Sequence, residues 1–360
     1  MAEPEGKETV GTPKEFAIYL AINIAIGFGL YQLLHNMQQT LAGTIFLALV
    51  IGTLMFWRFR VAIAFIGVVL LLLTRTIDLA HTIEFMNLDV ILFLVGMMTM
   101  VGLLRRSGFF RWLLGKALKI SRFKPNLLML IILFMSSLMA AMVDEVTSIL
   151  FMSALVLDLC DYYEVHPVNY IISVVLATNI GSSWTVLGNP IGILIALRSG
   201  LTFEDFIVTA LPIGVISLIS LMVIALLWQR SDLHHLGEKI VTKSKESEEG
   251  FLEQWARIED RGLFMGCAVV FILVIVGLAL HYRMELALGL EHNTLLVAIA
   301  IAGAGVVMLW KRAMARELLM RDVDWWTLVF FMFLFAKAGC LKYVGLTKII
   351  SASLYQLGGG

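Results

Sequence analysis

The stretch VDEVTS, residues 143–148, places two adjacent carboxylates and two hydroxyls inside a long apolar segment. Eighteen residues without a charge, 126–143, lead up to it, and nine more, 149–157, follow. A helix needs about 20 apolar residues to cross a bilayer, so this run is too long for one crossing and too short for two crossings with a loop. The sequence therefore predicts a re-entrant hairpin over 126–157, broken at 144–148. Lipid cannot satisfy exposed backbone groups, so the break has to be buried in protein or line a wet cavity.

A second uncharged segment, 168–197, is also too long for one straight span. Its middle reads NIGSSWTVLGNPIG, residues 179–192. Glycine adds backbone freedom and proline removes a hydrogen-bond donor, so this helix is expected to unwind near its centre. Paired hydrophobic segments that Gly and Pro interrupt mark the binding site of many transporters. The two interrupted segments together predict such a site.

The composition is that of a polytopic membrane protein. The 360 residues are 60% hydrophobic and 15% charged, with a mean hydropathy of +0.90. The formal net charge is zero, which gives no indication of nucleic-acid binding. The three cysteines, Cys160, Cys267 and Cys340, lack CxxC or CxxH spacing, so they are expected to form neither a disulfide framework nor a metal site. No cofactor is expected. Residues 1–15 lack the basic start of a secretory signal, so the first apolar stretch is expected to remain as a span.

The apolar and polar segments divide the chain into four parts. We predict an N-terminal segment and first span (1–40), a first repeat (41–228), a cytoplasmic linker loop (229–262) and the start of a second, truncated repeat (263–360). The first repeat also holds a basic amphipathic helix (105–124) on the inner surface and a span at 207–228. Short loops assigned to the inside hold 13 Lys/Arg and those assigned to the outside hold 3. This bias places the N-terminus and the linker in the cytoplasm.

An internal repeat links the two halves of the chain. Residues 87–113 align with 324–350 at a constant offset of 237, which pairs Gly102 with Gly339, Gly108 with Gly345 and Arg105 with Lys342. Counting spans, the copies run in opposite directions, as in an inverted repeat. The second copy ends before a hairpin of its own, so the sequence is expected to be an N-terminal part of a longer transporter, without transport activity by itself.

Four motifs carry a resemblance to a known family. They are MVDEVTSILFMSALVLDL (142–159), ATNIGSSWTVLGNP (177–190), GLTFEDF (200–206) and VDWWTLVFF (323–331). With them the chain resembles the ion transporter superfamily, in particular its citrate-transporter-like group with arsenite permeases, NhaD-type antiporters, the melanosomal P protein and the divalent anion:sodium symporter relatives. The resemblance implies an all-α, inverted-repeat membrane fold with a re-entrant hairpin and an unwound helix, often as a homodimer.

The chain departs from the family pattern at both breaks. The family's hairpin tip usually reads Asp-Asn-Val-Thr-Thr, whereas residues 144–148 read Asp-Glu-Val-Thr-Ser. The family's unwound helix often reads Gly-Asp-Pro-Pro-Asn, whereas residues 188–192 read Gly-Asn-Pro-Ile-Gly. One carboxylate is thus gained at the tip and one is lost from the loop, which leaves sodium and proton coupling both open.

Hard oxygen ligands suit a cation such as sodium, and both breaks are rich in them. A helix that restarts near Thr147 would also point the positive end of its dipole toward an anionic group. We expect a sodium ion at Asp144, Thr147, Ser148, Ser182 and Asn189. The full substrate- and ion-binding set is Asp144, Glu145, Thr147, Ser148, Asn179, Gly181, Ser182, Ser183, Thr185, Gly188, Asn189 and Pro190. Lys337, a lone charge inside a span, is interpreted as snorkelling or paired rather than as a substrate ligand.

These features predict a secondary active transporter in the cell membrane rather than an enzyme. It would move a small anion (citrate, a dicarboxylate or arsenite) or exchange sodium for protons, using a Na⁺ or H⁺ gradient by alternating access. Its partners would be the lipid bilayer, the transported ion and a second copy of the chain. The alternatives are an intramembrane enzyme that depends on the two acids, which would need carboxylates facing each other from separate helices, and an ion channel.

Overall fold

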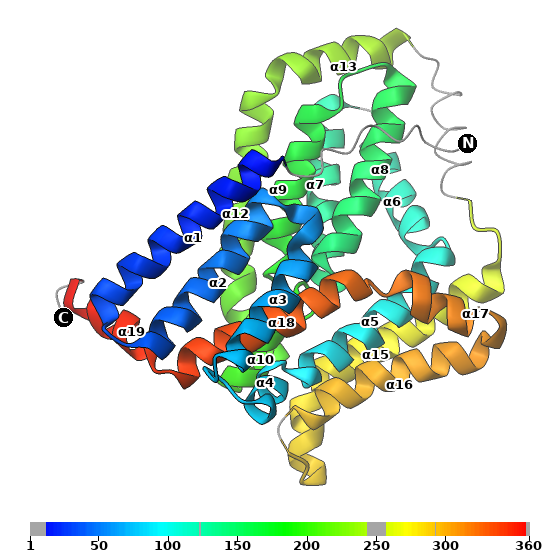
Figure 1. The fold of residues 1–360 in the computed structure, drawn as a ribbon. Coiled ribbons are helices and arrows are strands. Elements are labelled where there is room, and N and C mark those ends of the chain that lie inside the picture. Colours follow the sequence, from blue (N-terminus) through cyan, green and yellow to red (C-terminus); the bar gives the residue numbers. More distant parts are fainter. Residues whose placement is uncertain (1–11, 122–123, 243–256, 292, 358–360) are drawn as a thin grey trace. The chain divides into compact units, whose positions relative to one another are not determined.

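The computed structural model describes residues 12–121, 124–242, 257–291 and 293–357 (Figure 1). These residues are helical throughout, with turns between the helices and no β-strand. Eight of the described helices are long and apolar enough to cross a membrane. An all-helical fold is expected here because, in lipid, a helix satisfies its own backbone hydrogen bonds.

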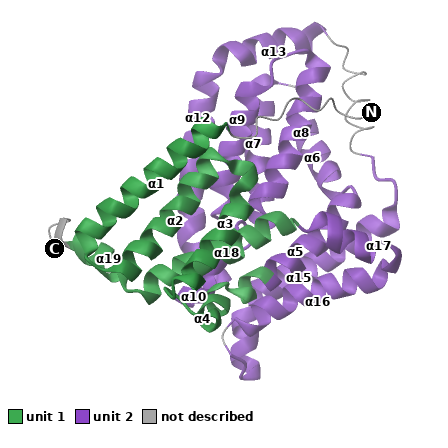
Figure 2. Ribbon diagram, in the orientation of Figure 1, with its two compact units in different colours: residues 1–91, 324–360 green, residues 92–323 purple. Residues whose placement is uncertain are grey.

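The helices form two compact units, residues 1–91 with 324–360 and residues 92–323 (Figure 2). Unit 1 thus combines the beginning and the end of the chain. Its elements are α1 (Pro13–Leu34), α2 (Met37–Met55), the 3₁₀ turn η1 (Trp57–Phe59), α3 (Arg60–Leu73), α4 (Leu79–Phe85), α18 (Trp325–Tyr343) and α19 (Leu346–Leu357). α5 (Leu88–Arg106) begins in unit 1 and continues in unit 2.

Within unit 1, α18 packs against α2, α3 and α4. The contacts between α3 and α18 advance in the same direction along both helices. The Arg60 guanidinium donates to Thr327 Oγ1 at 3.1 Å, the Phe65 and Phe333 rings lie 4.4 Å apart, and Gly67 lies against the end of the Lys337 side chain. α3 and α18 therefore run parallel. Lys337 is 1% exposed, so the interpretation that it snorkels is wrong.

Unit 2 contains the rest of the described helices. After α5 come α6 (Phe109–Ile120), α7 (Pro125–Met142), α8 (Glu145–Tyr163), α9 (Val168–Ser182), α10 (Pro190–Ser199), α11 (Phe203–Asp205), the π-helical turn η2 (Phe206–Ala210), α12 (Leu211–Trp228), α13 (Arg230–Thr242), α15 (Arg261–Leu288), α16 (Thr294–Trp310), α17 (Arg312–Glu317) and the π-helical turn η3 (Leu318–Asp322). Extended contacts join α7 with α9 and α15 with α16.

The offset of 237 residues recurs in the bounds of the helices. α5 and α6 have the same bounds as α18 and α19 after this shift, and η1 with α3 has the bounds of α16. Gly108 and Gly345, before α6 and α19, both adopt positive φ angles, +80° and +77°. Such angles favour glycine, so the same turn is built twice. We refer to residues 57–120 and 294–357 as the first and second copies.

Contacts between the copies also recur in pairs. A Cβ at Gly102 would lie 2.5 Å from Asp322 Cβ in unit 2, and a Cβ at Gly339 would lie 2.6 Å from Phe85 Cβ in unit 1. The two pairs occupy the same positions with the copies exchanged. Each unit therefore takes helices from both copies, α3 with α18 in unit 1 and α5 with α16 in unit 2.

Two sequence expectations about segment ends were wrong. The hairpin was expected to be non-helical at 144–148, but Glu145 begins α8 and the break is confined to Val143 and Asp144. α8 also runs past Asp158 and Asp161 to Tyr163, so that α7 and α8 have 18 and 19 residues and each is long enough to cross a membrane. The charges that ended the apolar run do not end the helix, because they lie on its exposed side.

The polar segment 229–262, expected to be a loop, begins with a helix. α13 covers 230–242 and packs against α7 and α8 through the buried side chains of Leu233 and Leu236. Residues 243–256 lie outside the described residues. The basic segment 105–124 is divided, because Gly108 ends the turn after α5 and α6 covers only 109–120.

Candidate ion-binding site

The two interrupted segments of the sequence pack together in unit 2. α7 and α8 are antiparallel, since Leu128 and Met129 near the beginning of α7 line one small apolar pocket with Cys160 and Tyr163 near the end of α8. α7 and α9 run parallel. The Ser137 hydroxyl donates to the Ala177 carbonyl at 2.7 Å. Both breaks consequently lie at the same end of this group of helices.

The α7–α9 contact is close because of Gly181. A Cβ at this position would lie 2.5 Å from the Ser137 carbonyl carbon and nearer still to its oxygen. One turn further along, the Thr185 hydroxyl donates to the Ala141 carbonyl at 2.5 Å. This bond fixes the second break against the last turn of α7.

Asp144 closes the first break as the N-cap of α8. Its backbone is extended (φ −176°), and its carboxylate accepts a hydrogen bond from the Thr147 N–H at 2.8 Å. The Asp144 carbonyl accepts the Ser148 N–H at 3.2 Å. A side-chain oxygen in this position replaces one of the bonds that the first turn of a helix lacks. The carboxylate is only 5% exposed, so it is a buried group that the helix start holds in place.

Asn189 plays the same part at the second break, residues 183–189. Its side-chain oxygen accepts the Gly192 N–H at 2.7 Å and caps α10, while its amide N–H₂ donates to the Ser182 carbonyl at 3.1 Å. Gly188 lets this loop fold tightly back over α9, since a Cβ there would overlap the backbone of Ser182. One side chain therefore ties the end of α9 to the beginning of α10.

Two hydrogen bonds join the breaks to each other. The Glu145 N–H donates to the Gly188 carbonyl at 2.9 Å, and the Ser182 hydroxyl donates to the Glu145 carboxylate at 3.1 Å. The C-terminal ends of α7 and α9 thus meet the N-terminal ends of α8 and α10. The first two carry partial negative charge and the last two partial positive charge. Such a place can hold a cation on one pair of ends and an anion on the other.

The predicted residues do not all face this place. Asp144, Glu145, Thr147, Ser148, Gly181, Ser182, Thr185, Gly188 and Asn189 lie at the joined breaks, and Pro190 is the first residue of α10. Asn179 and Ser183 are exposed and bond to the Val175 and Ile180 carbonyls of their own helix. The Ser148 hydroxyl is fully buried and has no hydrogen-bond partner among the described residues.

The bonding pattern favours a cation over an anion at the start of α8. The N–H groups of Glu145, Thr147 and Ser148 already donate to protein oxygens, so an anion would have to displace them. In the described residues, no three His, Cys, Asp or Glu side chains gather as a metal-binding cluster. The ligands on offer are instead the Asp144 carboxylate, the Ser148 hydroxyl and backbone carbonyls, which suit a hard cation.

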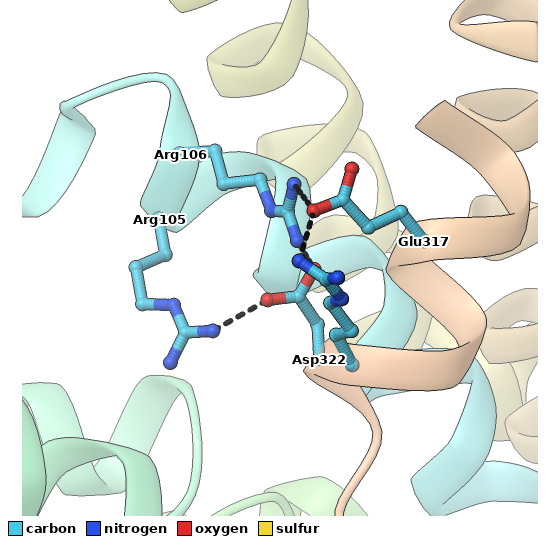
Figure 3. A network of polar contacts seen from close by, with 5 residues as sticks. Arg105, Arg106, Glu317 and Asp322 are labelled. Atoms are coloured by element: carbon cyan, nitrogen blue, oxygen red, sulfur yellow. Dashed lines mark hydrogen bonds and ion pairs between the residues drawn. The ribbon is translucent and has the colours of Figure 1, made fainter. Parts of the chain in front are cut away.

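Sequence reasoning missed a charged network at the end of α5 (Figure 3). Asp322 of η3 has a side chain that is 3% exposed and forms ion pairs with Arg105 at 2.5 Å and Arg106 at 2.8 Å. Arg106 also pairs with Glu317 at 3.2 Å. The pairing of Arg105 with Lys342 in the repeat was the signal that could have singled it out.

A family model described as citrate transporter matches residues 21–359. The chain belongs to the citrate transporter family. An uncharacterized transporter of Mycobacterium bovis is 32% identical over 273 residues, which cover 76% of this chain and 60% of the relative. An uncharacterized transporter of Mycobacterium tuberculosis matches equally well. The P protein of Mus musculus is 23% identical over 335 residues, covering 76% of this chain and 40% of the relative.

These matches confirm the family resemblance seen in the motifs. The family is one of membrane transporters, and the described part of this chain contains eight helices that are long and apolar enough to cross a membrane. The chain spans about 60% of the length of its mycobacterial relatives.

Proposed function

We propose that this protein is a secondary active transporter that moves a small carboxylate anion such as citrate, with the joined breaks at 143–144 and 183–189 as its ion-binding site. The observation that carries the proposal is the bond from Glu145 N–H to the Gly188 carbonyl, which brings four helix ends together. Interrupted helices whose ends face one point bind substrate and coupling ion in secondary transporters. The family description supports citrate as the first substrate to test.

The coupling ion would bind beside Asp144. Its carboxylate is buried, and the unpartnered Ser148 hydroxyl lies one turn along the same helix. Intramembrane carboxylates are costly and mark ion or proton pathways. Sodium would take these oxygens with the carbonyls at the ends of α7 and α9. A proton on one of the adjacent carboxylates, Asp144 or Glu145, is the other way to couple transport to a gradient.

Alternating access would follow from an inverted repeat of the two copies. α3 and α18, one helix from each copy, run parallel in unit 1, and the second copy repeats the helix bounds of the first. In an inverted repeat, one site opens to either side of the membrane in turn. The proposal includes a cytoplasmic N-terminus and linker, a re-entrant α7–α8 hairpin, and a homodimer.

The experiment is citrate uptake in liposomes by these 360 residues and by a longer chain that contains them, under a sodium gradient and a proton gradient separately. Uptake by the 360 residues alone would contradict the expectation from the sequence that they are inactive by themselves. Asp144→Asn is the central variant, because Asn caps a helix about as well as Asp and only the charge is lost. Asp144→Ala removes the cap as well and should cost about 1 kcal/mol of stability. We expect Asp144→Asn to unfold at the parent's temperature and to lose gradient-driven uptake.

Each other outcome decides against part of the proposal. Uptake by Asp144→Asn at the parent's rate would remove this carboxylate from coupling. Uptake of arsenite but not citrate would replace the substrate. An ion conductance that keeps rising with the citrate concentration and with the size of the gradient, without saturating, would indicate a channel.

A further inference from the structure

Lys337 lies in the middle of α18, in unit 1, and takes no part in the joined breaks. Its side chain is 1% exposed. Among the described residues its ammonium has one hydrogen-bond partner, the Ile63 carbonyl oxygen at 3.3 Å. That carbonyl belongs to the backbone hydrogen-bond pattern of α3. Gly67, one turn later, has no side chain, so the lysine can reach the carbonyl. An ammonium with a single neutral partner in an apolar helix contact carries a large desolvation cost.

The charged groups on the neighbouring helices are engaged elsewhere or exposed. On α3, the Arg60 guanidinium bonds to Thr327 and lies over the Trp57 ring. On α4, His81 pairs with Asp78 and Glu84 is exposed, and on α18 and α19, Lys342 and Lys348 are exposed. The residues of α2 include no charged side chain. Within the described part of unit 1, Lys337 therefore has no counter-ion.

The end of the Lys337 side chain lies directly against α3 at Gly67. A Cβ added at Gly67 would lie 2.6 Å from Lys337 Cε and nearer still to Nζ. The glycine therefore makes room for the end of the lysine. A transported anion or a sodium ion could reach it only if α3 and α18 separated.

The repeat supplies an internal control for this position. Met100 of α5 is the counterpart of Lys337 at the offset of 237, and it packs against α16 near Gly303, whose added Cβ would lie 3.4 Å from the Met100 sulfur. Met100 is 2% exposed. The same helix contact is therefore built in unit 2 with a long unbranched side chain and no charge. The packing needs the length of Lys337 and not its amine.

We infer that Lys337 is a proton-binding residue of the transport cycle, and that its protonation is coupled to the separation of α3 from α18. The amine nitrogen would take a proton from a hydronium ion when water reaches the contact, and return it to water when the cycle reverses, with no other bond made or broken. Closing the contact over an ammonium is unfavourable, so proton binding would bias the cycle toward the separated state. The inference rests on the proposed transport function and assigns it a second ionisable group, apart from Asp144.

The test replaces the amine by the residue that the other copy carries, Lys337→Met. Lys348→Met is the matched control, because it removes an exposed lysine of unit 1. Uptake of citrate and the proton movement that accompanies it, followed with a pH-sensitive dye inside the liposomes, are measured from pH 5 to 9. We expect Lys337→Met to be as stable as the parent, to keep downhill citrate exchange, and to lose at least tenfold in citrate-driven proton movement. The control should match the parent.

Proton movement by Lys337→Met at the parent's level, with an unchanged pH profile, would overturn the inference. Lys337→Gln, which can still donate to the Ile63 carbonyl, serves if the methionine variant does not fold. If the parent takes up no citrate, the proposed function fails, and the inference is judged on thermal unfolding in detergent. The pH dependence of the unfolding temperature should then change in Lys337→Met and not in Lys348→Met, and equal curves for all three proteins would refute it.

Discussion

Gly181→Ala tests the closeness of α7 and α9, on which the joined breaks depend. The new Cβ would lie 2.5 Å from the Ser137 carbonyl carbon, whereas ordinary contacts begin at 3.4 Å. The atoms in the way belong to a helix backbone and cannot rotate aside, so the helices must move apart. Overpacking of this kind costs about 1–3 kcal/mol, occasionally more. Separation also weakens the bonds Ser137–Ala177 and Thr185–Ala141, each worth about 1 kcal/mol.

Against this cost stands the better helix propensity of alanine, up to about 1 kcal/mol. The net expectation is a loss of roughly 2–4 kcal/mol, which would lower the unfolding temperature by about 5 °C or more. Gly305→Ala in α16 is the control, since a Cβ there meets nothing within 4 Å. It should leave the unfolding temperature unchanged or raise it.

The assay is thermal unfolding of the purified variants in one detergent, with citrate uptake measured on the fraction that stays folded. Gly181→Ala should lose uptake beyond its loss of stability, because Thr185 no longer holds the second break against α7. An unfolding temperature equal to that of Gly305→Ala would refute the reasoning, since α7 and α9 would then lie farther apart than the structure shows.

Two further predictions concern charge and topology. Asp322→Asn should destabilise the protein by about 1–3 kcal/mol, because two guanidinium groups lose a buried charged partner. The control, Arg321→Ala, removes one exposed ion pair with Glu317 and should change the stability by no more than about 0.5 kcal/mol. Equal unfolding temperatures for the two variants would contradict this prediction. Val241→Cys, at a position that is 85% exposed, should react with a membrane-impermeant maleimide only from the cytoplasmic side, and labelling of intact cells from outside would invert the proposed topology.

The sequence by itself determined the class of the protein and the places where its helices are interrupted. Runs of uncharged residues have to become helices in lipid, and Gly188 and Pro190 keep the second long run from forming one continuous helix, since Pro190 begins α10. The repeat was readable for the same reason. A turn that requires a positive φ keeps its glycine, as at Gly108 and Gly345, and the helix bounds recur at the offset that these glycines indicated.

The tertiary structure alone decided how these pieces meet. Hydropathy takes no account of the side of a helix on which a charged residue lies, so it predicted that the second helix of the hairpin ends at Asp158. In the structure the acidic side chains are exposed, and α8 continues to Tyr163. Capping confined the first break to two residues, because the Asp144 carboxylate satisfies the Thr147 N–H that an uncapped helix would leave open.

Contacts between distant residues have no sequence signal of their own. The Glu145–Gly188 bond joins breaks that lie 43 residues apart, and the Arg105–Asp322 pair lies 217 residues apart along the chain. The same holds for the burial of Lys337, which depends on a glycine of α3. A side chain's environment is set by the elements that pack around it, and only the folded chain brings those elements together.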